Sequence, residues 1–210
     1  MIRNRLAEIL FERDIKIVRI SKETGISRNT ITNTASNNSE MLQMNTINKI
    51  CGYLDITPCE FFEYIPIDID FSFFENSKID IVNDWKLDHI NCRANFDIDL
   101  LLDIDFKGEK YKIDTKIVVL DNILTTLPFG DEELKLSIES DENQINTLTN
   151  IFSEIPKEFK KMIYNNLVSE YKSFVSKHMD LNEKVDEFMT KKEIMKRTVF
   201  SITNDFLKYY

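Results

Sequence analysis

A short polar run in the N-terminal third of the chain carries the side chains best suited to recognising planar hydrogen-bonding groups. The segment Ile17–Asn33 reads IVRISKETGISRNTITN, and Gly25 divides it into two helix-forming halves, because a side chain would obstruct the turn. Ile20 and Ile31 are spaced so that two crossed helices bury them against each other. Ser27 then caps a helix whose first turn is polar. Such a helix fits the major groove of DNA, with its N-terminal residues at the base edges.

Two histidines and a row of aspartates are the other side chains that could do chemistry. His89 and His178 lack a neighbouring metal-ligand pattern such as HExxH, and His178 falls on an apolar stripe, which indicates packing. Four aspartates alternate with apolar residues, which is typical of the solvent face of a strand: Asp97, Asp99, Asp103 and Asp105. Phosphate-binding and dinucleotide-binding glycine patterns are missing from the sequence. We therefore expect no enzyme activity, no metal site and no cofactor.

Five short helices are predicted to position the polar run. The first covers roughly residues 2–13, the second 17–24 and the third 27–35. A fourth helix begins at Asn45 or Thr46 and carries apolar residues at spacings of three and four. Pro58 suits the first position of a fifth, short helix.

The pattern of apolar residues changes near Tyr64-Ile65-Pro66. Pro66 disfavours helix at Ile65. The following segment, Ile67–Phe73, alternates strictly between apolar and polar residues, as a half-buried strand does. We therefore predict two domains, residues 1–66 and residues 67–210.

The second segment is predicted to form a small antiparallel sheet followed by two or three helices, which makes the chain α+β. Residues 91–106 and 109–120 are β-rich runs joined at Lys107-Gly108, as in a hairpin, and residues 133–140 alternate as a further strand. From Ile155 onward the spacing is helical, with a stripe at Phe159, Ile163, Leu167, Tyr171, Phe174 and His178. A second stripe has spacings of four, three, four and three: Met195, Val199, Ile202, Phe206 and Tyr209.

Charge is divided unevenly along the chain. Residues 1–50 contain eight Lys or Arg and five Asp or Glu, a balance of +3; because the whole chain carries −9, the other residues carry −12. A basic N-terminal segment beside an acidic remainder indicates that only the first segment meets phosphate. The acidic part is better suited to self-association or to binding a protein partner.

The first segment resembles the Cro and lambda-repressor (XRE-like) type of helix-turn-helix domain. The resemblance rests on Thr-Gly-Ile-Ser followed by Thr-Ile, and on the later run TINKICGYLDITPCEFFEYIP, and it covers about residues 2–66. It implies an all-α, five-helix, lambda-repressor-like DNA-binding domain. The sequence departs from the family at Thr34-Ala35, where a large apolar residue is usual, and in the loop Ser36–Gln43, which lacks the usual glycine.

The resemblance also implies a role for individual side chains. By position, the base-contacting residues are Arg28, Asn29, Thr30, Thr32 and Asn33. Arg28 could donate two hydrogen bonds to guanine, and Asn29 or Asn33 could pair with adenine. Phosphate contacts are expected from Lys16, Arg19, Ser27 and Ser36.

These observations predict a cytoplasmic, bacterial transcriptional repressor of a phage or related mobile element. It would bind double-stranded operator DNA as a homodimer, with the stripe from Met195 to Tyr209 as the dimer seam. Self-cleaving tails of the LexA type are cut at an Ala-Gly or Cys-Gly bond, and here Cys51-Gly52 lies inside the first segment, so self-cleavage is rejected. An antirepressor or inducer protein that binds residues 67–210 is expected instead. The sequence also permits an antitoxin that regulates its own operon, or an activator.

Overall fold

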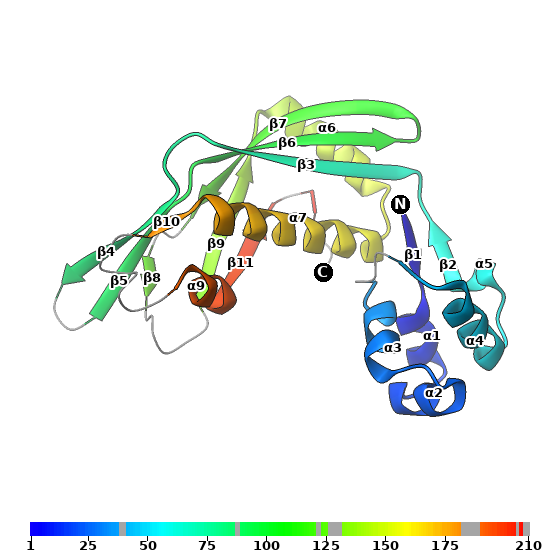
Figure 1. Cartoon of the computed structure of the whole chain (residues 1–210). Coiled ribbons are helices and arrows are strands. Elements are labelled where there is room, and N and C mark those ends of the chain that lie inside the picture. Colours follow the sequence, from blue (N-terminus) through cyan, green and yellow to red (C-terminus); the bar gives the residue numbers. More distant parts are fainter. Residues whose placement is uncertain are drawn as a thin grey trace. The chain divides into compact units, whose positions relative to one another are not determined.

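Two separate sets of contacts organise the chain in the computed structural model, one within Met1–Pro66 and one within Ile67–Tyr210. The structure describes residues 1–37, 41–86, 89–120, 123–125, 132–181, 190–204 and 206–207. We call the first unit the head and the second the body, and both are drawn in Figure 1. Among the described helices, none is both long enough and apolar enough to cross a bilayer.

The head contains the five expected helices and a two-stranded ribbon that the sequence did not predict. Its elements are β1 (Ile2–Asn4), α1 (Leu6–Glu12), α2 (Ile17–Thr24), α3 (Arg28–Ala35), α4 (Met44–Leu54), α5 (Pro58–Phe61) and β2 (Phe62–Tyr64). The prediction of a first helix from residue 2 was wrong, because Ile2–Asn4 pairs antiparallel with Phe62–Tyr64 and the helix begins only at Leu6.

The helices of the head surround one apolar core. Its fully buried members come from all five helices and include Leu6, Ile20, Ile31, Ile50 and Phe61. Thr57 and Glu60 form a reciprocal capping box at the start of α5, with Pro58 at the first helical position as predicted. These local signals explain why the head could be divided into its helices from sequence.

The body is a mixed α+β unit with two sheets. Its strands are β3 (Ile67–Glu75), β4 (Asp80–Lys86), β5 (His89–Asn95), β6 (Ile98–Phe106), β7 (Glu109–Val119), β8 (Ile123–Thr125), β9 (Glu132–Glu139), β10 (Asp180–Leu181) and β11 (Thr198–Thr203). Its described helices are α6 (Glu142–Ser153), α7 (Lys157–His178) and α9 (Lys191–Arg197). The larger sheet has the order β11-β9-β7-β6-β3, and the smaller has the order β10-β4-β5-β8.

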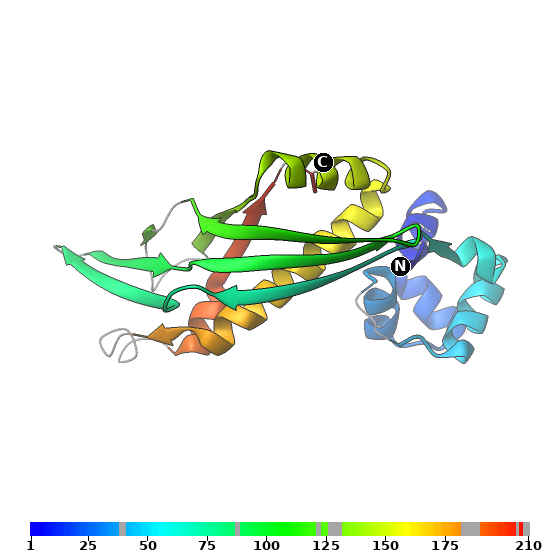
Figure 2. The ribbon, with the colours of Figure 1, turned by 90° about the horizontal axis from the view of Figure 1, so that it is seen from above.

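The long helix α7 lies along one face of the larger sheet in both views (Figures 1 and 2). The predicted stripe on α7 is confirmed at Phe159, Ile163, Leu167 and Tyr171, which are fully or almost fully buried. Strand β6 alternates without a break, with Ile98, Leu100, Leu102, Ile104 and Phe106 buried. The predicted hairpin at Lys107-Gly108 is also confirmed, since β6 and β7 pair antiparallel from Phe106 and Glu109.

The C-terminal part of the body corrects the predicted second helical stripe. The helix α9 ends at Arg197, and β11 follows it as an edge strand parallel to β9, so the sheet is mixed rather than antiparallel. The spacing of the apolar residues suited a helix, but the β-branched run Thr198–Thr203 also alternates between buried and exposed positions. Helix α6 was not predicted either, although Asp141 caps it through the backbone N–H of Gln144.

The five side chains predicted as a dimer seam therefore do not form one helical face. Met195, Ile202 and Phe206 are 6%, 3% and 4% exposed, which places them in the core of the body itself. Val199 lies on the opposite side of β11 and is 53% exposed. Tyr209 lies outside the described residues. Of the described members, only Val199 is open to a second copy, and dimerisation itself stays a prediction.

Replacing Tyr171 with phenylalanine is expected to stabilise the body by about 1 kcal/mol. The Tyr171 side chain is fully buried against Phe73 and Phe200, and its hydroxyl has no hydrogen-bond partner in the described structure. An unpaired buried hydroxyl loses its hydration without compensation, and removing it leaves the ring packing intact. Chemical denaturation of both proteins would measure the difference, and an equal or lower stability of Tyr171→Phe would contradict the expectation.

Candidate nucleic-acid interface

Helix α3 presents the five predicted base-contacting side chains to solvent. Arg28, Asn29, Thr30, Thr32 and Asn33 are all exposed. Ile31 and Thr34, three residues apart, are the buried residues of this helix. At 100° per residue, positions 28, 29, 32 and 33 share one face of the helix, and position 30 flanks it. The structure therefore brings the whole predicted set together on one open helical surface.

The N-terminus of α3 is capped as the sequence predicted. Ser27 Oγ accepts a hydrogen bond from the backbone N–H of Thr30 at 3.1 Å, and the two hydroxyl groups lie 2.8 Å apart. The first turn of α3 contains no acidic residue. The positive end of the helix dipole is thus not neutralised by the protein, which favours a nearby anion.

The turn between α2 and α3 depends on the backbone conformation of Gly25. Gly25 has φ +70°, and a Cβ added there would meet no atom within 4 Å. The expectation that a side chain would obstruct the turn was therefore wrong, and the requirement is the left-handed conformation. Ser21 Oγ donates to the carbonyl of Ile26 at 2.7 Å, which ties α2 to the segment that leads into α3.

The predicted phosphate-contacting residues occupy different places around α3. Lys16 is exposed at the N-cap of α2 and Arg19 is exposed in its first turn. Ser27 is exposed at the start of α3. Ser36 lies at the other end of α3, where its hydroxyl donates to the carbonyls of Thr32 and Asn33. Its hydrogen is therefore committed to the helix C-terminus in the unbound protein.

A hollow beside α3 contains a candidate phosphate contact that the sequence reading missed. Its volume is about 370 Å³, and it lies between the first turn of α3 and the start of α4. Gln43 gives α4 no side-chain cap, and the first turn of α4 has no acidic residue. The exposed Lys49 lines the same hollow. A helix start without acidic residues, followed by a lysine one turn later, is the sequence signal that could have identified it.

Two substitutions of Ser27 should separate its effect on helix stability from its effect on DNA affinity. Ser27→Ala removes the cap and should lower the unfolding free energy of the head by about 1 kcal/mol. Ser27→Asp keeps the cap but adds a negative charge at the surface predicted to meet phosphate, so DNA affinity should fall at least about tenfold. Thermal unfolding and DNA titration of both variants would test this. Equal DNA affinity of Ser27→Asp and the unaltered protein would contradict it.

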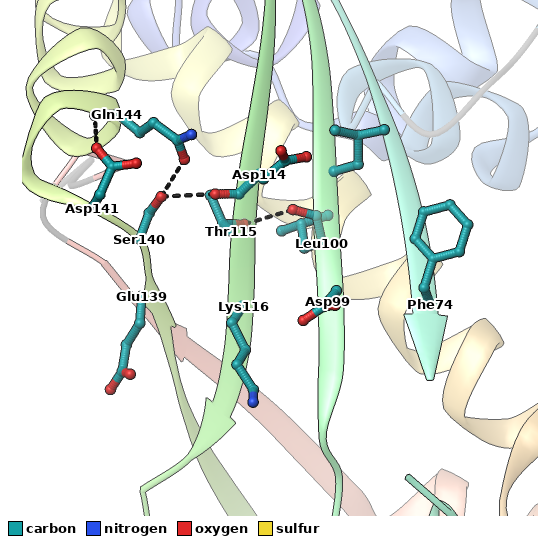
Figure 3. Close-up of a pocket in the computed structure, with 11 residues that line it drawn as sticks. Phe74, Asp99, Leu100, Asp114, Thr115, Lys116, Glu139, Ser140, Asp141 and Gln144 are labelled. Carbon is teal, nitrogen blue, oxygen red and sulfur yellow. Dashed lines mark hydrogen bonds between the residues drawn. The ribbon is translucent and has the colours of Figure 1, made fainter. Parts of the chain in front are cut away.

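A hollow of the body has a different chemistry. It measures about 570 Å³ and is lined mainly by outward side chains of β6, β7 and β9 (Figure 3). Its walls carry Asp99, Asp114, Glu139 and Asp141, and the ammonium of Lys116 is paired with Asp97 at 2.6 Å. The hydroxyl of Ser140 donates to the carbonyl of Asp114. Such a wall repels phosphate, and the described residues that line the hollow include neither histidine nor cysteine.

Of the side chains considered for other chemistry, His178 and the aspartates of β6 are accounted for by packing and solvent exposure, and the side chain of His89 lies outside the part that the structure describes. His178 Nδ1 lies 2.9 Å from the carbonyl of Phe174, and the two rings are 4.2 Å apart, in agreement with the packing role predicted for His178. Asp99, Asp103 and Asp105 lie on the outward side of β6, as predicted, whereas Asp97 precedes the strand. Within the described ranges, no group of three or more His, Cys, Asp or Glu side chains could hold a metal ion.

Comparison with known proteins identifies the head. Residues 5–66 match the family of Cro/C1-type HTH DNA-binding domains. Neither a curated protein nor a solved structure matches the chain. The match covers α1 to α5 and includes the whole exposed face of α3. The chain therefore carries a Cro/C1-type helix-turn-helix DNA-binding domain, which implies DNA binding and transcriptional regulation.

Proposed function

We propose that the protein is a transcriptional repressor that reads operator DNA through α3. The observation that carries the proposal is the exposed polar face of α3, with Arg28, Asn29, Thr32 and Asn33 on one side and Ile31 buried on the other. A helix-turn-helix domain places this second helix in the major groove, where its N-terminal side chains reach the base edges. A protein held at an operator that overlaps a promoter excludes RNA polymerase, which is repression.

The side chains of α3 divide into readers of bases and contacts to the backbone. Arg28 has the fork geometry for guanine O6 and N7, and Asn29 and Asn33 have the paired donor and acceptor for adenine. Phosphates would be held by Lys16, Arg19 and other exposed groups around α3, including Ser27 and, when its hydroxyl turns from the helix carbonyls, Ser36. Lys49 and the uncapped start of α4 add a phosphate contact on the far side of the hollow.

Dimerisation is part of the proposal because one head makes few contacts. Two heads spaced by one helical turn of DNA, about 34–36 Å, would read a pseudo-palindromic site with a combined affinity that neither has alone. The body is the element available for self-association and for a controlling protein partner, since its acidic charge keeps it away from DNA. The phage or mobile-element setting rests on the resemblance of the head to that class of repressor.

Selection of bound sequences from a random duplex library, using the full-length chain, tests the proposal. We expect an enriched pseudo-palindrome, and footprinting should place it near the promoter of the protein's own gene. A reporter driven by that promoter should lose expression when the protein is supplied. Enrichment of no sequence at low salt would refute sequence-specific binding, and increased reporter expression would show an activator in place of a repressor.

A further inference from the structure

Two asparagine side chains join the N-terminal strand to the C-terminal end of α3. Asn37 Oδ1 accepts hydrogen bonds from the backbone N–H of Asn4 at 2.8 Å and from Asn4 Nδ2 at 2.7 Å. Asn37 Nδ2 donates to the carbonyl of Asn4 at 3.0 Å, so the two residues bind each other in both directions. Asn4 Nδ2 also donates to the carbonyl of Thr34, inside the last turn of α3, at 2.7 Å.

Asn4 is buried and Asn37 is half-buried, and the hydrogen-bonding capacity of this asparagine pair is almost fully used. Asn4 is 4% exposed, and its Oδ1 also accepts from the backbone N–H of Leu6 at 3.1 Å. Asn37 has φ +56°, a left-handed conformation that asparagine tolerates better than most residues. Polar groups that are buried and fully paired specify one geometry, because any shift leaves a group without a partner.

Helix α3 needs such a constraint because its apolar burial is small. It has eight residues, and only Ile31 and Thr34 among them are buried. Thr34 Oγ1 has no described hydrogen-bond partner, so the cost of burying this hydroxyl offsets part of the stabilisation from the Thr34 methyl group. The N-terminal end of α3 is set by the turn at Gly25 and the cap at Ser27. The asparagine pair is the corresponding constraint at the other end.

The strand that carries Asn4 is itself firmly attached to the head. Arg3 is 7% exposed and forms ion pairs with Glu8 of α1 at 2.7 Å and with Glu63 of β2 at 2.6 Å. Burial alone would lower the pKa of Arg3, but the hydrogen bonds and charges of these two carboxylates raise it, so the guanidinium stays charged. Arg3 thereby links β1 to two neighbouring elements. Asn4, the next residue of β1, links this anchored strand to α3 through its hydrogen bond to the carbonyl of Thr34.

We propose that Asn4 and Asn37 are positioning residues for base recognition: they hold α3 at the tilt that sequence-specific binding requires. The proposal rests on the proposed function of α3. A contact set that discriminates bases must be held to within about 0.5 Å, whereas phosphate contacts tolerate more variation. Loss of the pair should therefore weaken operator binding more than binding to unrelated DNA.

The test compares the full-length protein with Asn37→Gly and with a matched control, Asp55→Gly. Glycine keeps the left-handed backbone of residue 37 without strain and removes only the side chain. Asp55 also has positive φ, at the end of α4, and its exposed side chain forms no hydrogen bond or ion pair with the described residues of α3. We expect Asn37→Gly to lose about tenfold in operator affinity, with little change in affinity for unrelated duplex DNA, and Asp55→Gly to bind as the unaltered protein does.

Measurements are made where thermal unfolding shows each protein to be fully folded. If Asn37→Gly does not fold, Asn37→Asp replaces it, because a carboxylate keeps both acceptor contacts with Asn4 but places an oxygen, in place of the donor, against the Asn4 carbonyl. A loss of operator affinity is then expected that is larger than any loss on unrelated DNA. Operator affinity equal to that of the unaltered protein, or an equal loss on both DNAs, would overturn the inference. Failure of the unaltered protein to prefer any sequence would instead refute the proposed function.

Discussion

Replacement of Arg28 by alanine should remove about 1–3 kcal/mol of discrimination at one base pair of the operator. Arg28 is the first residue of α3, it is exposed, and no acidic residue occupies the first turn beside it. Its guanidinium is therefore available for two parallel hydrogen bonds to a guanine. Binding to operators that differ at single positions, measured with the full-length protein, should show the preference lost at one position in each half-site.

Arg28→Lys is the matched control, because it keeps the charge and loses the fork. If Arg28 reads a base, lysine should restore affinity for unrelated DNA and the salt dependence of binding, but not the preference for guanine. If Arg28 only contacts phosphate, lysine should restore operator binding as well. That second outcome would show that base recognition lies elsewhere on α3, with Asn29 and Asn33 as the next candidates.

The exposed polar face of α3 could be predicted from sequence because its determinants are local. A glycine in the left-handed conformation, a serine cap and two inward isoleucines specify α2, the turn and α3 within a few residues of one another. The cap at Ser27 and the exposure of Arg28 and Asn33 follow directly. Lys49 was missed because the local signal at the start of α4 does not show that α4 packs beside α3, and it is this packing that brings Lys49 to the same hollow.

The asparagine pair could not be predicted for the same reason. Asn4 and Asn37 are far apart in sequence, and their hydrogen bonds exist only once β1 has paired with β2. The N-terminal residues Ile2–Asn4 read as part of a helix, since their apolar and polar residues fit that spacing equally well. Pairing with Phe62–Tyr64 at the other end of the head decided the conformation.

In the body, elements with a clear periodicity could be predicted from the sequence. Every second residue of β6 is apolar and buried, and α7 repeats its apolar residues over many turns, so both regions were predicted, although the predicted β-rich run 91–106 divides into β5 and β6 of different sheets. The segment Thr198–Thr203 fits both periods, and its parallel pairing with β9 selected the strand. A parallel partner distant in sequence leaves no turn signal between the strands, in contrast to Lys107-Gly108 in the β6–β7 hairpin.

Truncation of Ile31 to alanine should lower the unfolding free energy of the head by about 2–5 kcal/mol. Ile31 is 0% exposed and is the main apolar anchor of α3 in the core of the head. The matched variant in the body is Ile163→Ala, since Ile163 is 1% exposed on α7. Because the two units have separate sets of contacts, each substitution should shift one thermal transition and leave the other unchanged.

Calorimetry of the full-length chain would detect both transitions, and DNA binding gives an independent assignment of the first. The unfolding that Ile31→Ala moves to lower temperature should be the one that operator DNA moves to higher temperature, because a ligand stabilises the unit to which it binds. Val18→Ala, at an exposed site on α2, should leave both transitions within about 0.5 kcal/mol of the unaltered protein. A single transition that both isoleucine variants lower together would mean that the head and body unfold as one cooperative unit, and that the effects of head substitutions on DNA binding cannot be separated from the stability of the body.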